Sequence, residues 1–133
     1  DFRALAQAMR AGGYWIEVET SGGYTLPCEV PVDSWVMDIK CPASGMERFN
    51  KYGELARLRP QDQLKFVIVD RQDFQFALEL LRKHSPVCHI LFSPAFGQLE
   101  PTILSEWLKE EAPQARLSLQ IHKYIWDPSR RGV

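Results

Sequence analysis

The first forty residues combine the hydrophobic spacing of a helix with that of strands. Phe2, Leu5 and Met9 recur at the interval of one helix face, and Gly12-Gly13 follows where such a helix should stop. Over residues 14–19, and again over residues 34–40, apolar positions alternate with their neighbours, as they do in a half-buried strand. This part of the chain is therefore predicted to form a helix followed by two strands.

The rest of the chain alternates apolar strands with amphipathic helices. Residues 63–69, 87–92 and 116–122 are predicted strands. Asp70 stands where an N-cap belongs, before a helix that carries Phe74 and Leu78, and a later helix presents Leu104 and Leu108. A short helix is expected around residues 49–56. The helical connections between these strands are long enough to cross over the sheet, so that successive strands can run parallel. The pattern therefore predicts an α/β fold, either a parallel sheet or a partial barrel with outer helices.

A parallel unit normally begins with a strand, yet this sequence begins with an amphipathic helix. We therefore expect one or more βα units before Asp1, which would provide that helix with its sheet partner. There is no low-complexity segment and no break in composition. Residues 1–133 are accordingly expected to form one α/β domain.

The amino-acid composition argues against some classes of protein. The 133 residues are 45% hydrophobic and 25% charged, with a net charge of -1, which is the balance of a globular domain without the basic excess of a nucleic-acid binder. No apolar run is long enough to span a bilayer, and no signal-peptide pattern is present. These features predict a cytoplasmic protein with no direct nucleic-acid or membrane partner. The three cysteines and three histidines are too widely spaced for a local metal motif.

Polar residues follow the predicted strands, where ligands bind in parallel α/β folds. Examples are Glu19 and Thr20, Asp38 and Lys40, and Ser93. Within the last predicted strand, Ser118, Gln120 and His122 would share a face. Each residue alone also has an ordinary structural interpretation: a surface carboxylate for Glu19, an extended ammonium for Lys40, and a hydrogen-bonding side chain for His122.

The combination of these segments is more specific than any single residue. The segments are residues 19–22 (ETSG), 38–42 (DIKCP) with Ser44-Gly45, 64–68 (LKFVI), Ser93-Pro94, and 120–126 (QIHKYIW) leading to the final RGV. In this order they resemble the 7-carboxy-7-deazaguanine synthases, radical S-adenosylmethionine enzymes of the queuosine pathway. The resemblance covers the whole chain and corresponds to the middle and carboxyl-terminal parts of the family, whose CxxxCxxC-type cluster motif is absent here.

The resemblance implies a partial TIM-like barrel and a lyase reaction. 6-Carboxy-5,6,7,8-tetrahydropterin would become 7-carboxy-7-deazaguanine with loss of ammonia, using S-adenosylmethionine, a reduced [4Fe-4S] cluster and Mg²⁺. The activity would belong to the full-length protein, and this chain alone would be inactive, because none of its residues is expected to bind the cluster or the metal. A homodimer is left open.

The resemblance also implies residue roles. The expected cofactor-binding residues are Glu19, Asp38, Ile39, Lys40, Ser93, Pro94, Ala95 and Phe96. The expected substrate-binding residues are Thr20, His122 and Val133, and no catalytic residue is assigned. Two alternatives remain from the residues alone: another α/β nucleotide-binding domain, and a noncatalytic binding module.

Overall fold

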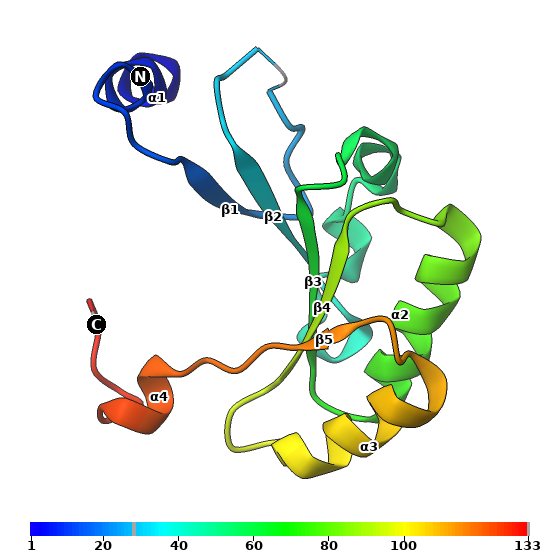
Figure 1. Cartoon of the computed structure of the whole chain (residues 1–133). Helices are drawn as coiled ribbons and strands as arrows, with labels where there is room; N and C mark the ends of the chain where they lie inside the picture. The colour runs from blue at the N-terminus through cyan, green and yellow to red at the C-terminus, as the bar shows by residue number, and fades with distance from the viewer. Residues whose placement is uncertain (28, 133) are drawn as a thin grey trace.

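The computed structural model describes residues 1–27 and 29–132. Its strands form one parallel sheet in the order β1-β2-β3-β4-β5 (Figure 1). The strands are β1 (Glu17–Ser21), β2 (Ser34–Ile39), β3 (Gln63–Ile68), β4 (His89–Pro94) and β5 (Arg116–Leu117). The α/β class with parallel strands and helical connections is thus confirmed, and the sheet formed by the described residues is open.

Four α-helices and three short 3-10 helices connect or flank these strands in the described part of the chain. They are α1 (Phe2–Ala11), η1 (Pro42–Ser44), η2 (Glu47–Phe49), η3 (Tyr52–Arg57), α2 (Arg71–His84), α3 (Pro101–Glu111) and α4 (His122–Ile125). Asp70 is the N-cap of α2, as predicted, because its side chain accepts a hydrogen bond from the Asp73 amide at 2.9 Å.

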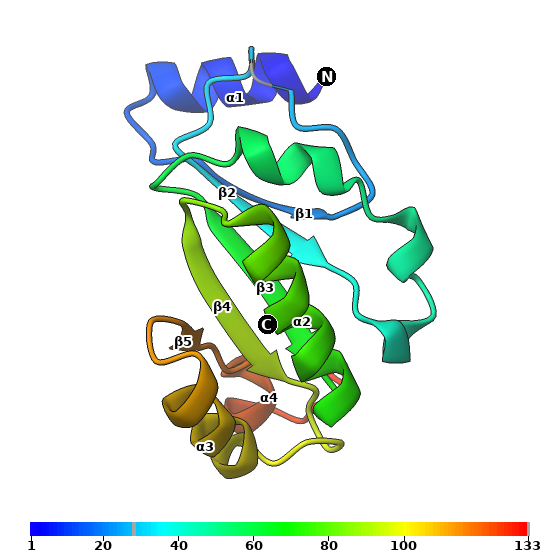
Figure 2. The ribbon, with the colours of Figure 1, turned by 90° about the vertical axis from the view of Figure 1, so that its right-hand side faces the viewer.

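One face of the sheet is apolar and carries the core. Leu64, Phe66 and Ile68 of β3 are fully buried on this face. The rings of Phe66 and Phe92 stack at 5.3 Å, and Phe74 of α2 packs against Phe92, also at 5.3 Å. Figure 2 shows α2 lying along this face, with α3 beside it. Burial of these rings supplies the main hydrophobic stabilisation of the fold.

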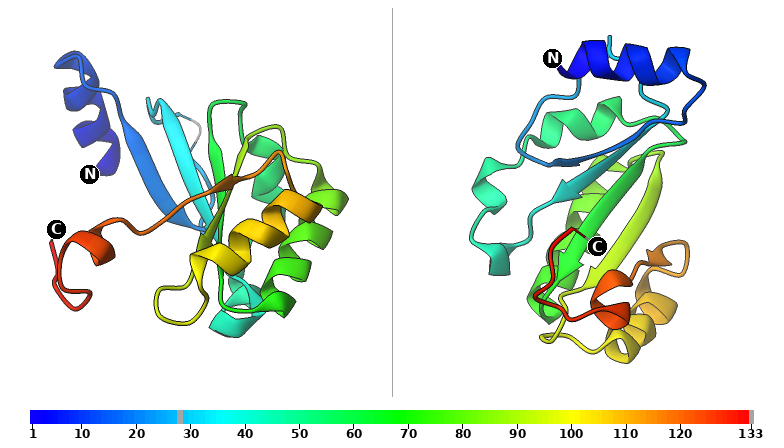
Figure 3. Two further views of the ribbon diagram at one scale, coloured as in Figure 1. Left: turned by 60° about the horizontal axis from the view of Figure 1, so that its bottom comes forward. Right: turned by 90° about the vertical axis from the view of Figure 1, so that its left-hand side faces the viewer.

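The opposite face, which we call the open face, is polar. Strand register aligns its residues in rows across the sheet: Glu17, Glu19 and Ser21 of β1, Ser34, Val36 and Asp38 of β2, Gln63, Lys65 and Val67 of β3, and His89, Leu91 and Ser93 of β4. Among the described residues, α1 and α4 stand at opposite ends of this face and no helix covers its middle (Figures 1 and 3). Parallel sheets are normally covered on both faces, so this polar surface is the unusual feature of the fold.

Two predicted strands begin later than expected. β1 begins at Glu17 rather than at residue 14, and Tyr14 and Trp15 are 64% and 70% exposed. The Asp33 carboxylate accepts the Ile16 amide at 2.8 Å, so the strand ladder begins only beyond it. β4 begins at His89 rather than at residue 87, because His89 is the residue in register with the first residue of β3, Gln63.

The last strand is much shorter than predicted. β5 contains only Arg116 and Leu117, and His122 lies in α4 instead of at the end of a strand. The Ser118 amide donates to the Phe92 carbonyl at 2.8 Å. The backbone groups of residue 94, like those of Phe92, face β5. Pro94 has no N–H with which to continue the ladder. The prediction that Ser118, Gln120 and His122 share a strand face is therefore wrong.

Candidate functional site

The candidate site lies at the carboxyl ends of β1 to β4, which meet at one edge of the sheet because the strands are parallel. A cavity of about 280 Å³ opens at the ends of β2 and β3. Its lining comes from the ends of β2 and β3, from η1 and α2, and from the segment after β5: Asp38, Ile39, Lys40, Cys41, Ser44, Val67, Val69, Asp73 and Gln120. Asp38, Ile39 and Lys40, which the sequence predicts to bind a cofactor, thus all line this cavity.

Asp38 and Lys40 form the charged pair of this cavity. The Lys40 ammonium donates to Asp38 Oδ2 at 2.7 Å, and both side chains are partly exposed. The other carboxylate oxygen, Asp38 Oδ1, is buried and has no hydrogen-bond partner in the described structure. Buried polar atoms are normally paired, so Asp38 retains an acceptor that a bound donor can use.

Ser93 provides a second such atom on the same face. Its side chain is 1% exposed, and its Oγ has no hydrogen-bond partner among the described residues. Ser93 and Pro94 lie inside β4 rather than in the predicted loop, and only Ala95 and Phe96 follow the strand. The Ala95 amide donates to the Ile68 carbonyl at 2.8 Å, which continues the β3–β4 ladder past the strand end.

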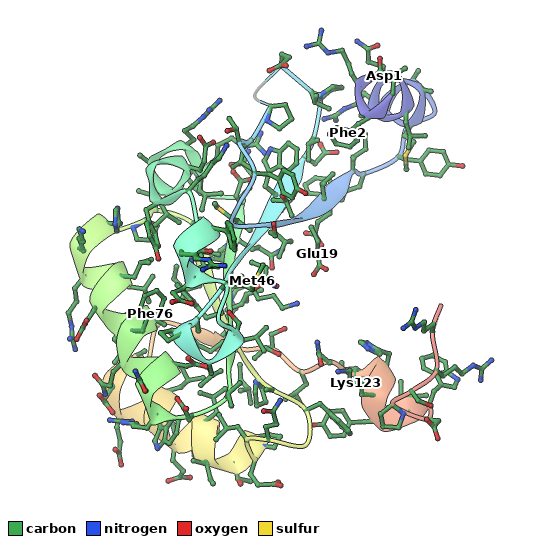
Figure 4. The ribbon with its side chains drawn as sticks, turned by 180° about the vertical axis from the view of Figure 1, so that it is seen from behind. Asp1, Phe2, Glu19, Met46, Phe76 and Lys123 are labelled. Carbon is green, nitrogen blue, oxygen red and sulfur yellow. The ribbon has the colours of Figure 1, made fainter. Side chains whose placement is uncertain are left out.

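Glu19 faces the open side without lying at the cavity. Figure 4 shows its side chain pointing from β1 into the space that Lys123 of α4 faces from the other side. Its carboxylate lies 3.5 Å from the Lys65 ammonium, and 70% of the Glu19 side chain is exposed. Because the Glu19 side chain is largely exposed, the pair contributes little to stability, and the Glu19 carboxylate remains accessible to a ligand.

Lys65 is a site residue that the sequence reasoning missed. It lies on the open face in register with Asp38, and its side chain is only 17% exposed. The signal was present, since Gln63, Lys65 and Val67 alternate with the buried residues of β3. The sequence analysis assigns this segment to an apolar strand and to the family resemblance, and gives Lys65 no role of its own.

The predicted substrate-binding residues do not gather at one point. Thr20 lies in β1 next to the strand end, with its hydroxyl donating to the Ser21 carbonyl at 3.2 Å. His122 is half-buried at the start of α4, and Val133 lies outside the described residues. The carboxyl-terminal helix is held next to the site by the Tyr124 ring, which packs edge-on against Phe96 at 5.2 Å.

A loop anchored by Asp73 forms one wall of the cavity. Asp73 is fully buried, and its carboxylate accepts the amides of Ala43 at 2.9 Å and Val69 at 3.1 Å. It thereby ties η1, which follows β2, to the end of β3. A larger cavity of about 370 Å³ lies at the opposite edge, near the amino ends of β4 and β5, and contains none of the predicted site residues.

The described cysteines do not suit metal or cluster binding. Cys41 and Cys88 are buried. Burial, reinforced by the carboxylates of Asp73 and Asp38, raises the pKa of Cys41, and burial raises the pKa of Cys88 to about 11. Metal ligation requires thiolates, and within residues 1–27 and 29–132 no group of three or more His, Cys, Asp or Glu is arranged to hold a metal ion.

We expect the thiols of Cys41 and Cys88 to be unreactive in the folded chain at pH 8. Both would be protonated and buried, whereas an unfolded cysteine has a pKa of about 8.5 and reacts readily. Titration with a thiol-reactive disulfide dye, in a Cys28→Ser background, should release dye only when urea is added. Rapid release without urea from either cysteine would contradict this expectation.

The fold and the polar strand ends place the chain among parallel α/β proteins with a candidate ligand site at the carboxyl edge. Three curated relatives named 7-carboxy-7-deazaguanine synthase are similar to it. The relative from Koribacter versatilis is 40% identical over 92% of this chain and 61% of its own length. Those from Leptospira interrogans and Chlorobaculum tepidum are 45% and 36% identical, over 87% of this chain and 50% and 55% of their own lengths.

These similarities confirm the resemblance inferred from the sequence segments: the chain is a homologue of part of the 7-carboxy-7-deazaguanine synthases. The chain spans between half and about three-fifths of the length of these relatives. No family model matches the chain, and no solved structure matches it. None of the helices in the described residues is long and apolar enough to cross a membrane.

Proposed function

We propose that the natural protein carrying this sequence is a 7-carboxy-7-deazaguanine synthase. It would be a cytoplasmic radical S-adenosylmethionine lyase that converts 6-carboxy-5,6,7,8-tetrahydropterin to 7-carboxy-7-deazaguanine in queuosine biosynthesis. The similarity to proteins of that name over about nine-tenths of the chain carries the proposal. The residues described above support a role for this chain in binding the cofactor and the pterin.

The donor and acceptor set of the site fits S-adenosylmethionine. The cofactor carries amino groups and ribose hydroxyls that can donate, and a carboxylate that can accept. Asp38 Oδ1 and Ser93 Oγ are buried atoms on the open face that lack partners in the described structure, and Lys40 supplies a cation at the cavity. Bound hydrogen-bond donors would satisfy the unpaired oxygens, and the cofactor carboxylate would face Lys40 or Lys65.

The chemistry of the reaction comes from bound groups that this chain helps to orient. With a reduced [4Fe-4S] cluster, S-adenosylmethionine supplies the one-electron chemistry that starts the ring contraction. Asp38, Lys40 and Ser93 would hold the cofactor at the strand ends. Glu19, on the open face of the neighbouring strand, would contact the pterin or the cofactor ribose. The Thr20 side chain points to the opposite face of β1, so Thr20 would reach the pterin only through its backbone. Holding two reactants at a fixed distance and angle is the main contribution of such a scaffold.

The described cysteines do not fit the [4Fe-4S] cluster, because Cys41 and Cys88 are buried and have raised pKa values. No residue described here is assigned to the cluster or to Mg²⁺. The proposed partial barrel would also account for the open face: parallel sheets are normally covered on both faces, and no helix of the described residues covers the middle of this one.

Calorimetric titration of the complete natural protein, reconstituted anaerobically, with S-adenosylmethionine tests this proposal. We expect Asp38→Asn to weaken binding by about tenfold or more, because a hydrogen bond to a charged group is worth about 1.5–3 kcal/mol. We expect Glu19→Gln to weaken it less, because that carboxylate is largely exposed.

Glu17→Gln is the matched control, since Glu17 lies on the same face of β1, at the amino end, and pairs with Gln63. Its affinity should equal that of the unchanged protein. No binding of S-adenosylmethionine by the unchanged protein, or equal binding by Asp38→Asn, would overturn the proposed role of the strand ends.

A further inference from the structure

The side-chain amide of Asn50 forms hydrogen bonds with both backbone groups of Lys40. The Lys40 amide donates to Asn50 Oδ1 at 3.1 Å, and Asn50 Nδ2 donates to the Lys40 carbonyl at 2.8 Å. Asn50 follows η2 and is only 9% exposed. A buried side chain that satisfies both backbone groups of one residue determines where that residue lies.

The held residue is the point at which β2 leaves the sheet. The last paired residue of β2 is Ile39, opposite Phe66, so the backbone of Lys40 has no partner in the strand ladder. Asn50 provides the hydrogen bonds that a neighbouring strand would otherwise provide. The Lys40 side chain, ion-paired to Asp38, then projects from a fixed backbone into the cavity.

The same segment also holds the end of β1. The Gly22 amide donates to the Asp38 carbonyl at 2.8 Å, and the Gly22 carbonyl accepts the Lys51 amide at 2.7 Å. Asn50 and Lys51 are adjacent, so one short stretch of chain ties the carboxyl ends of β1 and β2 together. Through this junction the spacing between Thr20 and the Asp38–Lys40 pair depends on the position of Asn50.

We propose that Asn50 is a positioning residue for S-adenosylmethionine: it sets the direction of Lys40 and Asp38 toward the ligand by way of the Lys40 backbone. This inference rests on the proposed function. Asn50 touches the backbone and not the ligand. The role needs an acceptor and a donor on one planar group; a carboxylate in its place would turn an oxygen toward the Lys40 carbonyl oxygen.

The test compares Asn50→Asp with Tyr52→Phe in the complete natural protein. The Tyr52 hydroxyl accepts the remaining hydrogen bond of Asn50 Nδ2 at 3.3 Å, so Tyr52→Phe removes a neighbouring contact and leaves both bonds to Lys40. For Asn50→Asp we expect the Kd for S-adenosylmethionine to rise about tenfold or more, because small displacements of a binding group are costly. For Tyr52→Phe we expect a change of less than about twofold.

Hydrogen exchange supplies a second measurement. In Asn50→Asp the amides of Lys40 and Cys41 should exchange faster, while those of Phe66 and Phe92 in the core should not change. Faster exchange with unchanged affinity would overturn the positioning role, as would an equal loss of affinity in Tyr52→Phe. Absence of binding by the unchanged protein would instead overturn the proposed function, and this inference with it.

Discussion

Replacing Gly22 by alanine is expected to destabilise the fold and to abolish ligand binding at the strand ends. An added Cβ would lie 2.7 Å from Ile39 Cδ1 and 2.8 Å from Asn50 Oδ1, closer than real side chains approach. The Asp38 carbonyl is also near, at 3.3 Å. Overpacking of this kind costs about 1–3 kcal/mol, and the movement that relieves it must displace Asn50 or the end of β2. Urea unfolding followed by tryptophan fluorescence measures the first effect, and calorimetry with S-adenosylmethionine the second.

Gly53→Ala is the matched control for this change. Gly53 lies in η3, three residues beyond Asn50, and an added Cβ there would meet nothing within 4 Å. Its unfolding free energy should stay constant or rise by about 0.4–1 kcal/mol, because alanine restricts the unfolded chain. If Gly22→Ala were as stable as Gly53→Ala and bound the cofactor equally well, the close junction between β1 and β2 would have no functional importance.

Elements with strong local signals were predictable from the sequence. The N-cap at Asp70 and the apolar stripe containing Phe74 placed α2, and Leu104 and Leu108 placed α3. The first and last residues of the strands were harder to predict from the sequence, because they depend on pairing with a neighbouring strand. β4 is shifted by its register with Gln63, and β5 ends where Pro94 interrupts the ladder.

The same distinction holds for the candidate site. Asp38, Lys40 and Ser93 could be proposed as site residues from the sequence, because parallel strands present their last residues at one edge. Asn50 and Asp73 were not found, because each acts on backbone atoms of another segment, 10 residues away for Asn50 and Lys40 and 30 for Asp73 and Ala43. Sequence spacing carries no signal for such contacts. The strand face predicted for His122 is absent because β5 ends at Leu117, and Val133 lies outside the described residues.

A buried carboxylate at the opposite edge of the sheet supports the whole arrangement. Asp62 is fully buried and accepts the amides of Trp35 at 3.0 Å and Arg59 at 2.7 Å. Its carboxylate also accepts the Arg59 guanidinium at 2.8 Å. Burial alone would raise the pKa of Asp62, but the hydrogen bonds from Arg59 and Trp35 outweigh burial and hold the pKa below its usual value. Asp62 thus joins the start of β2 to the segment before β3.

Asp62→Asn is therefore expected to lower the unfolding free energy at pH 7 by about 2–3 kcal/mol. Disrupting a buried ion pair costs about 3–5 kcal/mol, and the smaller figure allows for the 41% exposure of the Arg59 side chain. Because the pKa of Asp62 is lower in the folded state than in the unfolded state, its stabilisation is present above about pH 4 and is lost as the pH falls through the folded value. The difference between the two proteins should thus be constant from pH 7 to pH 5 and shrink below pH 4, as measured by urea unfolding at each pH.

Asp127→Asn separates this effect from a general response of carboxylates to acid. Hydrogen bonds from the Ser129 hydroxyl and amide lower the pKa of Asp127 too, but this residue is exposed near the carboxyl end, outside the core. Its replacement should leave the urea midpoint unchanged at every pH, since nothing buried depends on it. Two results would contradict a stabilising role for the ionised Asp62 carboxylate: an unchanged urea midpoint in Asp62→Asn, or a loss of unfolding free energy that is as large at pH 2 as at pH 7. A loss of unfolding free energy confined to the higher pH range would mean that the charge on Asp62 holds Trp35 and Arg59 in place. Trp35 lies at the start of β2, and Asp38 and Lys40 lie at its other end, so Asp62 fixes the strand on which the candidate site is built.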